Sequence, residues 1–544
     1  MARSALAGYA IAVLAGVLAL CLFQAYRAGF SGADEPAHFL NGYFVSNYLR
    51  HHLGSNPMAF ATEYYLHYPK ISIGHWPPAY YGILGVLFLG LPATPEMAFA
   101  INLLVAALPA AAVGLTLAYL AGVRAAVAGC LIYAFTPLAL EGQLFFMLDQ
   151  ALSACIVAAA MVWVAYAQRP SWPRAFGFAA LSALAVLIKG NGWLIVFVPP
   201  LHMLLTRDWR PLASPRLYVA AAAAGAVIVP WYWLTSKIAA DGFNYTAGWH
   251  YATLALGANL HTLVRNLGYA SLPLALLAVA LEYRARAATP LRWSVASACL
   301  GLIVATLALQ SLVPVDIDDR YLAPALPALA VLAVAGARRV YEWLGAGARP
   351  ALALPAAVLL AAAMLAPGMA HLAGRGAKVD MRMAAIPYSA RGAQGAAPQV
   401  WIIDGSSGAE GAFIAQMAVR DPALSDYAVR ASKLLAASNF MGTQYTLKFP
   451  DPRGVLAEVE RVGAQYVVLV RLNNEAPYPH SGQLQAAMAL PDSPFRRVAT
   501  LAHGNRAGVT EVYEFHGAAR ANVDAVRQLG LPAKTAPLLN LQPK

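Results

Sequence analysis

The segment GFSGADEPAHFLNGYF, residues 29–44, follows an apolar run that ends near Tyr26. It is typical of a helix, and it places two adjacent carboxylates, Asp34 and Glu35, where a membrane helix should leave the lipid. Ionisable groups near lipid are costly and tend to mark function. The acidic pair is therefore the first candidate site, although two carboxylates at a helix end could also do no more than solvate it.

The composition of the whole chain is that of a membrane protein. Of its 544 residues, 60% are hydrophobic and 12% are charged, whereas soluble domains carry about 25% charged residues. A helix needs roughly 20 apolar residues to cross a bilayer. We therefore predict an α-helical polytopic membrane domain with about eleven transmembrane helices, at residues 5–25, 97–119, 125–141, 150–167, 175–188, 192–206, 217–235, 266–281, 294–313, 321–337 and 350–367. The apolar stretch 79–92 is predicted to be interfacial or re-entrant.

Charged residues become frequent after about residue 368, which predicts a second domain. We expect a membrane domain over residues 1–368, with a long first external loop at 27–95, and a soluble domain over 369–544. In the second domain PQVWIID and AQYVVLV are typical of buried strands, and GAFIAQMAV and GVLAEVERVG of amphipathic helices. This alternation predicts a small soluble α/β domain. The segment GSSGAEG is interpreted as a strand-to-helix turn rather than a nucleotide-binding loop, because its glycine spacing is not GxGxxG.

Basic residues gather on alternate connections between the predicted spans. Together with the N-terminus, these connections carry thirteen arginines and only three acidic residues. By the positive-inside rule this side is cytoplasmic, so the acidic pair and the second domain lie outside, which in a bacterium is the periplasm. We expect a multi-pass protein of the bacterial inner membrane. Membrane lipids are predicted partners, and nucleic acid is not, because no basic stripe with interleaved aromatics is present.

The termini and the cysteines add little to this assignment. The N-terminal apolar run is interpreted as an uncleaved anchor rather than a signal peptide. The four cysteines, at positions 21, 130, 155 and 299, all fall in apolar spans, and their spacing matches no metal site. A tail without cysteine fits an oxidising compartment without disulfides. The sequence demands no cofactor; acidic groups outside the membrane could hold a divalent metal ion, but no ligand spacing requires one.

Ionisable residues collect at the external corners of the predicted bundle. They are Asp34, Glu35, His75, Asp149, Lys189, Asp316, Asp318, Asp319 and Arg320. Ordinary alternatives exist: His75 can cap a turn, Lys189 can snorkel to the headgroups, and the aspartates near position 318 can form a solvated turn. The combination, with a belt of Tyr and Trp, predicts a polar cavity beside the bilayer. Such a cavity suits a substrate with a lipid tail and an anionic head.

Five sequence blocks occur in order along residues 33–333: ADEPAHFLNG, HWPPAYYGILGVLFLG, MLDQAL, IKGNGWLIV and DRYLAPALPALAVLA. This set resembles the successive blocks of the polyprenyl-phosphate-sugar glycosyltransferases of the GT-C fold. They include the protein O-mannosyltransferases (glycosyltransferase family 39) and the lipid A aminoarabinose transferases. The resemblance covers about residues 1–370. It implies a multispan fold with an external active site, a polyprenyl-phosphate-linked sugar donor, and an acceptor that is a lipid, a glycan or a protein.

The resemblance also implies roles for single residues. The base in such families lies in the acidic motif of the first loop, which maps onto Asp34. A single inverting displacement needs one base for the acceptor hydroxyl, and the departing lipid phosphate needs positive charge rather than a general acid. Lys189 and Arg320 are our first candidates for this charge, and His75 and Lys70 are the second. In the aminoarabinose branch the position that matches His75 in the HWPP block is often Lys, so His75 weakens an assignment to that branch.

The remaining candidates support the substrates. Glu35 is assigned to acceptor orientation or to a structural pair. Substrate binding is predicted for Tyr80, Tyr81, Asp149 and Tyr321. Two other functions stay open: a transporter or flippase of a lipid-linked sugar, and a non-catalytic assembly or sensor subunit. Transporters often show paired repeats and broken helices at the bilayer midplane, whereas here the ionisable groups lie at helix ends on one side and no repeat is evident.

Overall fold

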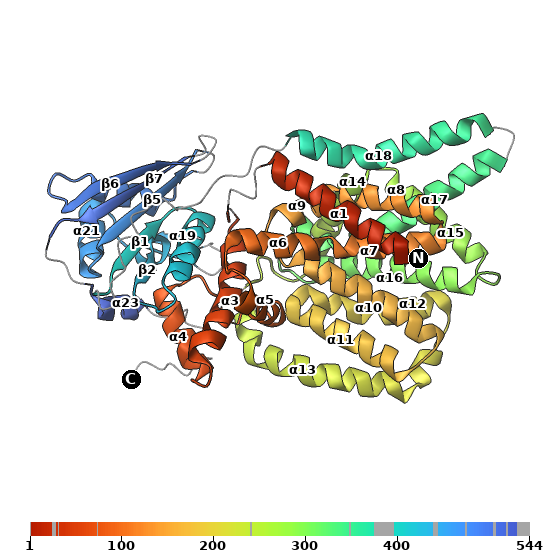
Figure 1. Ribbon diagram of the computed structural model, residues 1–544, viewed down its shortest axis with the longest axis horizontal. Helices are drawn as coiled ribbons and strands as arrows, with labels where there is room; N and C mark the ends of the chain where they lie inside the picture. The colour runs from red at the N-terminus through yellow and green to blue at the C-terminus, as the bar shows by residue number, and fades with distance from the viewer. Residues whose placement is uncertain are drawn as a thin grey trace.

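The computed structural model describes residues 2–23, 29–30, 32–72, 74–239, 242–346, 350–374, 397–438, 444–473, 476–503, 508–517 and 521–529. Helices fill the first part of the chain, and a small domain that contains a β-sheet follows it. Figure 1 shows this domain at one end of an elongated helical bundle, beside helices α3 and α4, with the N-terminus near the other end. The predicted boundary at residue 368 stays a prediction, because α18 runs to Gly374 and residues 375–396 lie outside the described residues.

The helical part contains α1 (Ala2–Leu22), α3 (Glu35–Asn47), α4 (Pro57–His67), α5 (Ala79–Gly90), α6 (Pro95–Ala106), α7 (Leu108–Leu120), α8 (Val123–Ala134), α9 (Pro137–Leu144), α10 (Asp149–Gln168), α11 (Trp172–Ile188), α12 (Val198–Thr206), α13 (Pro215–Ala239), α14 (Trp249–Leu267), α15 (Ser271–Arg284), α16 (Pro290–Leu312), α17 (Ala325–Ala346) and α18 (Ala353–Gly374). Short π- and 3₁₀-helical turns join them at Tyr48–His52, Gly190–Phe197, Arg210–Ala213, Asp319–Leu322 and Pro350–Leu352.

Several helix boundaries follow directly from the sequence. Thr94 and Thr136 each accept a hydrogen bond from a backbone N–H in the first turn of the next helix, and a proline follows each of them. A hydroxyl at the N-cap and a proline at the first helical position are the preferred way to start a helix. Because Pro137 cannot donate a backbone hydrogen bond, the chain bends there by 60° between α8 and α9. Gly268, with φ of 78°, allows a second bend of 92° between α14 and α15.

The chain is a multi-pass membrane protein, as predicted. Among the described residues, six helices are long and apolar enough to cross a membrane, or up to eight if each bent pair is one span. Three shorter apolar helices accompany them, among them Ala79–Gly90, which falls on the stretch predicted to be interfacial or re-entrant. Each of the eleven predicted spans falls on one or two of the helices, but their number as spans stays a prediction.

The second domain is an α/β domain, as predicted. Its sheet has the order β2-β1-β5-β7-β6, in which β1 is parallel to β2 and β5, and β7 is antiparallel to β5 and β6. The five strands are β1 (Val400–Asp404), β2 (Tyr427–Arg430), β5 (Tyr466–Leu472), β6 (Phe495–Ala502) and β7 (Gly508–Phe515). A short pair, β3 (Ala436–Ala437) and β4 (Thr446–Leu447), stands apart. The helices are α19 (Ser407–Arg420), α20 (Ala431–Leu434), α21 (Pro452–Arg461), α22 (Pro479–Met488) and α23 (Val523–Leu529).

Alternate residues of the buried strand β1 pack into two different hydrophobic cores. Trp401 and Ile403 belong to the same core as α19, and that core continues into the helical part. Val400 and Ile402 belong to a second core with α21, α22 and α23. This division follows from the two-residue period of a strand, which points successive side chains to opposite faces. The GSSGAEG segment is indeed a strand-to-helix turn, in which Ser406 caps α19.

The α/β domain is held against the first external loop. The hydroxyl of Tyr68 donates to Asp421 Oδ2 at 2.5 Å, and Asn47 Nδ2 donates to the carbonyl of Pro422 at 3.0 Å. His67 Nδ1 lies 2.8 Å from the carbonyl oxygen of Asp426, and Arg527 forms an ion pair with Glu63. The predicted loop 27–95 is thus largely helical and forms the platform for the second domain.

The Tyr68–Asp421 hydrogen bond should contribute measurably to this docking. Tyr68 is fully buried, and Asp421 Oδ2 also accepts from the backbone N–H groups of Ser425 and Asp426. Removing the hydroxyl with Tyr68→Phe should destabilise the docked domain by about 1–3 kcal/mol, because a buried charged acceptor loses a donor. Limited proteolysis and thermal unfolding of the purified protein measure this loss. The matched control is Tyr478→Phe at a half-exposed position; equal behaviour of the two variants would contradict the assignment.

Candidate active site

The two carboxylates of the opening motif point to different surroundings. Asp34 is the N-cap of α3, and its side chain is 34% exposed. Glu35 is the first residue of the helix and is fully buried, close to Gly32. Successive residues of a helix are rotated by about 100° from each other. Two adjacent residues can therefore lie on different faces, one exposed and one buried. Asp34 is therefore the accessible carboxylate of the two.

Arg320 joins Asp34 from the far end of the membrane domain's sequence. It lies in the short 3₁₀ turn Asp319–Leu322 that precedes α17. Its Nη1 donates to Asp34 Oδ2 at 3.1 Å, and its Nε lies 2.8 Å from Asp318 Oδ2. The ion pair with Asp34 links residues that are 286 positions apart, whereas Asp318 is a close neighbour of Arg320 in the sequence. Arg320 is thus shared between two carboxylates.

Lys189 and Asp149 form a second pair beside the first. Lys189 follows the last residue of α11, Asp149 is the first residue of α10, and Nζ lies 2.6 Å from Oδ1. The Lys189 ammonium also lies 4.6 Å from the centroid of the Tyr321 ring, and the guanidinium carbon of Arg320 lies 5.5 Å from the same centroid. The Tyr321 ring therefore connects both cations. Asp34, Asp149, Asp318, Arg320, Lys189 and Tyr321 form one group, which we call the Asp34 cluster.

The protonation states follow from burial and from these neighbours. Burial alone would raise the pKa of Asp34. Positive charge nearby holds that pKa below its ordinary value of 3.8; it comes from His38 when that ring is protonated, from Arg320 and from Lys70. Burial lowers the pKa of His38 to about 3, so His38 is neutral at neutral pH and Arg320 supplies the stabilising charge. Burial also lowers the pKa of Arg320, but the charges of Asp149, Asp318 and Asp34 outweigh it and raise that pKa above its ordinary value. Asp34 is therefore an ionised carboxylate at neutral pH.

His38 is a neighbour of the Asp34 cluster that the sequence analysis missed. It lies one turn after Asp34 in α3, on the same face, and its Nδ1 is 2.8 Å from the hydroxyl of Tyr81. Its ring also packs 4.4 Å from Trp76. The four-residue spacing from Asp34 was the available signal, because residues i and i+4 of a helix are neighbours.

The two tyrosines of α5 lie inside the protein. Tyr80 and Tyr81 are 6% and 5% exposed. Tyr81 supports His38, and the Tyr80 ring packs against Phe146 at 6.1 Å. In this structure they line the interior behind Asp34 rather than an open surface. Their predicted contact with substrate stays a prediction.

The other two predicted phosphate-binding residues, Lys70 and His75, lie in the chain segment between α4 and α5. Lys70 Nζ donates to the carbonyl and the hydroxyl of Ser407, at 3.0 and 3.1 Å, at the start of α19. Burial lowers the pKa of Lys70 to about 7. Lys70 thus contributes to the docking of the α/β domain. His75 is half-buried in the turn before Pro77 and Pro78. A role of either residue at the donor phosphate stays a prediction.

The three aspartates before α17 separate rather than form one solvated turn. Asp316 accepts from Asn244 Nδ2 at 3.0 Å, and Asp319 accepts from Thr262 and pairs with Arg265. Only Asp318 of the three pairs with Arg320 among the described residues. Sequence spacing alone could not divide them, since each partner comes from another part of the chain. Within the described residues, no three His, Cys, Asp or Glu side chains come together as a metal site.

Comparisons with known proteins agree with this architecture. The family model described as dolichyl-phosphate-mannose-protein mannosyltransferase matches residues 87–233. The structure of ArnT from Cupriavidus metallidurans bound to undecaprenyl phosphate is similar at 15% identity, with a TM-score of 0.52, over 96% of this chain and 99% of that one. The same protein in its apo state gives a TM-score of 0.53 at 15% identity, over 96% of this chain and 98% of that one.

A second solved protein has the same architecture. The apo oligosaccharyltransferase of Archaeoglobus fulgidus is similar at 13% identity, with a TM-score of 0.51, over 85% of this chain and 69% of that one. No curated protein sequence matches the chain. At these identities the likeness shows the fold alone. The resemblance stated from the five sequence blocks is confirmed at that level, because the chain has the fold of the GT-C membrane glycosyltransferases.

Proposed function

We propose that the protein is a glycosyltransferase of the inner membrane. It moves a sugar from a polyprenyl-phosphate donor to an acceptor hydroxyl on the periplasmic side. The observation that carries the proposal is the meeting of Asp34 with Arg320, one carboxylate and one cation from distant blocks, at one end of the bundle. The similar ArnT structure is bound to undecaprenyl phosphate, which supports a lipid phosphate of this class as the carrier of the donor sugar.

Asp34 acts as the base in this proposal. Its carboxylate is ionised at neutral pH and partly exposed, so it can accept the proton of an acceptor hydroxyl. The hydroxyl oxygen forms its bond to the anomeric carbon as the bond from that carbon to the phosphate oxygen breaks, which inverts the centre. The phosphate leaves with the electron pair and gains one negative charge. No protein acid is needed, because a phosphate is already a stable leaving group.

The cations of the Asp34 cluster stabilise the departing phosphate. Arg320 offers a planar fork of N–H donors that matches phosphate geometry, and Lys189 offers a compact charge. In the resting structure Arg320 is divided between Asp34 and Asp318. A donor phosphate that binds Arg320 competes with Asp34 for the same guanidinium. Since that guanidinium lowers the pKa of Asp34, its partial loss makes Asp34 a stronger base once the donor is bound.

Buried neighbours keep the base in place. Neutral His38 and Tyr81 support the first turns of α3 from inside. Glu35 is fully buried, which favours the structural alternative over acceptor orientation. Lys189 keeps its position through Asp149, which starts α10. Preorganised charges of this kind cost no reorganisation during the reaction.

Replacing the base tests the proposal directly. Asp34→Asn should lower turnover by roughly 10²–10⁴-fold, the usual contribution of a general base, while thermal unfolding of the purified protein stays close to that of the wild type. Cells that lack the protein are complemented with each form, and envelope glycans and glycolipids are compared by mass spectrometry. The control is Asp208→Asn, the same change at a half-buried site in the connection between α12 and α13. Undiminished product from Asp34→Asn would refute the role of the base.

The pH dependence of turnover tests the coupling between Asp34 and Arg320. A carboxylate base is lost as the pH falls through its pKa, and the pKa of Asp34 lies below 3.8. The wild-type rate should therefore show no acid limb from Asp34 down to about pH 5. Arg320→Gln should raise the pKa of Asp34 and move the acid limb to higher pH, in addition to weakening donor binding.

Arg320→Lys is the matched control for this experiment, because it keeps the charge and loses the planar fork. It should weaken donor binding without moving the acid limb. The profiles are measured as kcat/KM against pH with the donor that the glycan comparison identifies. The same acid limb in Arg320→Gln and in the wild type would contradict the proposed coupling.

A further inference from the structure

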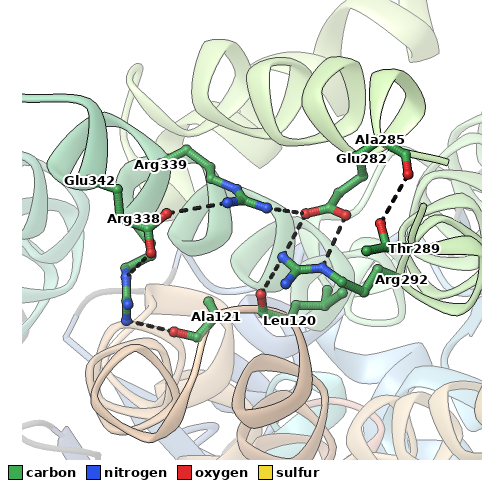
Figure 2. A network of polar contacts seen from close by, with 9 residues as sticks. All are labelled: Leu120, Ala121, Glu282, Ala285, Thr289, Arg292, Arg338, Arg339 and Glu342. Carbon is green, nitrogen blue, oxygen red and sulfur yellow. Dashed lines mark hydrogen bonds and ion pairs between the residues drawn. The ribbon is translucent and has the colours of Figure 1, made fainter. Parts of the chain in front are cut away.

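A second charged cluster lies at the end of the bundle opposite to Asp34. Arg320 directly precedes α17, whereas Arg338 and Arg339 lie toward the end of that helix, and Arg292 lies in the first turn of α16. The thirteen residue steps from Ala325 to Arg338 span about 20 Å along the helix axis. Figure 2 shows these arginines with two glutamates, Glu282 and Glu342, beside the backbone of Leu120 and Ala121. We call this group the arginine cluster.

The arginines of this cluster join the helix ends. Glu282 accepts from Arg292 Nη2 at 2.7 Å and from Arg339 Nη2 at 3.0 Å. Glu342 accepts from Arg338 Nε at 2.8 Å and from Arg339 Nη1 at 3.2 Å. Arg292 and Arg338 also donate to the carbonyls of Leu120 and Ala121, at 2.6 and 2.7 Å, where α7 ends. The dashed lines in Figure 2 trace this chain of contacts through α7, α15, α16 and α17.

A cavity of about 250 Å³ opens among these side chains. Three arginines face two glutamates in its lining, so it carries a surplus of one positive charge. Each guanidinium has five N–H groups. Within the part of the chain that the structure describes, Arg338 and Arg339 each use two of them in hydrogen bonds. Donors therefore remain for a further acceptor.

A helix N-terminus adds to the positive potential of the cavity. Gly122 lines the cavity and is the N-cap of α8, which has 12 residues. It has φ of 85°, a conformation that favours glycine, and no side chain caps the first N–H groups of α8. Uncapped N–H groups at a helix N-terminus attract anions, and phosphate in particular. Two independent features, the arginine surplus and the α8 N-terminus, thus favour the same kind of ligand.

We propose that this cavity binds the phosphodiester headgroup of an anionic phospholipid. The cavity lies at the end of the membrane helices, and Ala118, Ala278 and Ala335 give it an apolar wall. It is smaller than the roughly 300–1,000 Å³ of pockets for drug-sized ligands, so it accepts a headgroup while the acyl chains stay in the bilayer. Basic pockets between membrane helices bind such headgroups at the cytoplasmic side, and the sequence places the arginine-rich end there. The site is separate from the Asp34 cluster and does not depend on the proposed function.

Thermal unfolding of the full-length protein tests the site. The protein in a neutral detergent is titrated with phosphatidylglycerol, with phosphatidylcholine of the same chains, and with inorganic phosphate. Phosphatidylglycerol alone should raise the Tm. Arg338→Gln should weaken the apparent affinity for phosphatidylglycerol about tenfold, because one charged donor to the phosphate is lost. The control is Arg286→Gln, an exposed arginine outside the cavity lining, which should leave the affinity unchanged.

Each alternative outcome overturns the proposal. Equal stabilisation by inorganic phosphate would identify a site for a free anion, and equal losses in Arg338→Gln and Arg286→Gln would identify general surface attraction. If Arg338→Gln does not fold, the site is tested in the wild-type protein by crosslinking with a photoactivatable phosphatidylglycerol. Its crosslinks should map by mass spectrometry to residues 118–124 or 335–342. Crosslinks spread over the helices without enrichment there would exclude the site.

Discussion

The ion pair between Asp34 and Arg320 is the contact on which the arrangement of this end of the bundle depends. Charges beside a membrane are costly to bury unless they are paired. Arg320 meets this requirement for Asp34 and Asp318 together, and Lys189 meets it for Asp149. The start of α3, the start of α10 with the end of α11, and the turn before α17 therefore come together at this end of the bundle. The helices between them are positioned by that requirement as well as by their apolar faces.

The α/β domain shares α3 with the Asp34 cluster. A side chain at Gly411 in α19 would meet Pro36 of α3 at 2.6 Å and Lys70 at 2.5 Å, so the close approach of the two parts requires glycine there. Pro36 lies two residues after Asp34, at the start of the same helix. The second domain is thus packed directly against the helix that presents the proposed base. Because the two parts are in such close contact, a shift of the α/β domain would displace α3. The position of the domain is therefore coupled to the position of Asp34.

The sequence predicted secondary-structure elements better than the long-range contacts between side chains, for a physical reason. The apolar segments PQVWIID and AQYVVLV predicted the two strands that the structure places at Val400–Asp404 and Tyr466–Leu472. The sequence also indicated that Asp149, Lys189 and Arg320 share one end of the bundle. It could not show that Ser407 binds Lys70, since that partner lies 337 residues away. Nor could it show that Tyr81 turns inward to His38, because spacing gives the face of a helix but not the element that covers it.

The charges of the Asp34 cluster explain why one arginine should contact both the base and the leaving phosphate. Arg320 and Lys189 face Asp34, Asp318 and Asp149, so the cluster carries one negative charge in surplus. In the proposed reaction the phosphate gains a second negative charge as it departs, which this surplus would oppose. The proton that Asp34 takes from the acceptor removes one carboxylate charge at that same moment. Neutral Asp34 then holds Arg320 less strongly, and the guanidinium is free for the phosphate. In the proposed reaction, base and leaving group are thereby coupled through a single side chain, because the proton transfer to Asp34 lets the charge of Arg320 turn toward the departing phosphate.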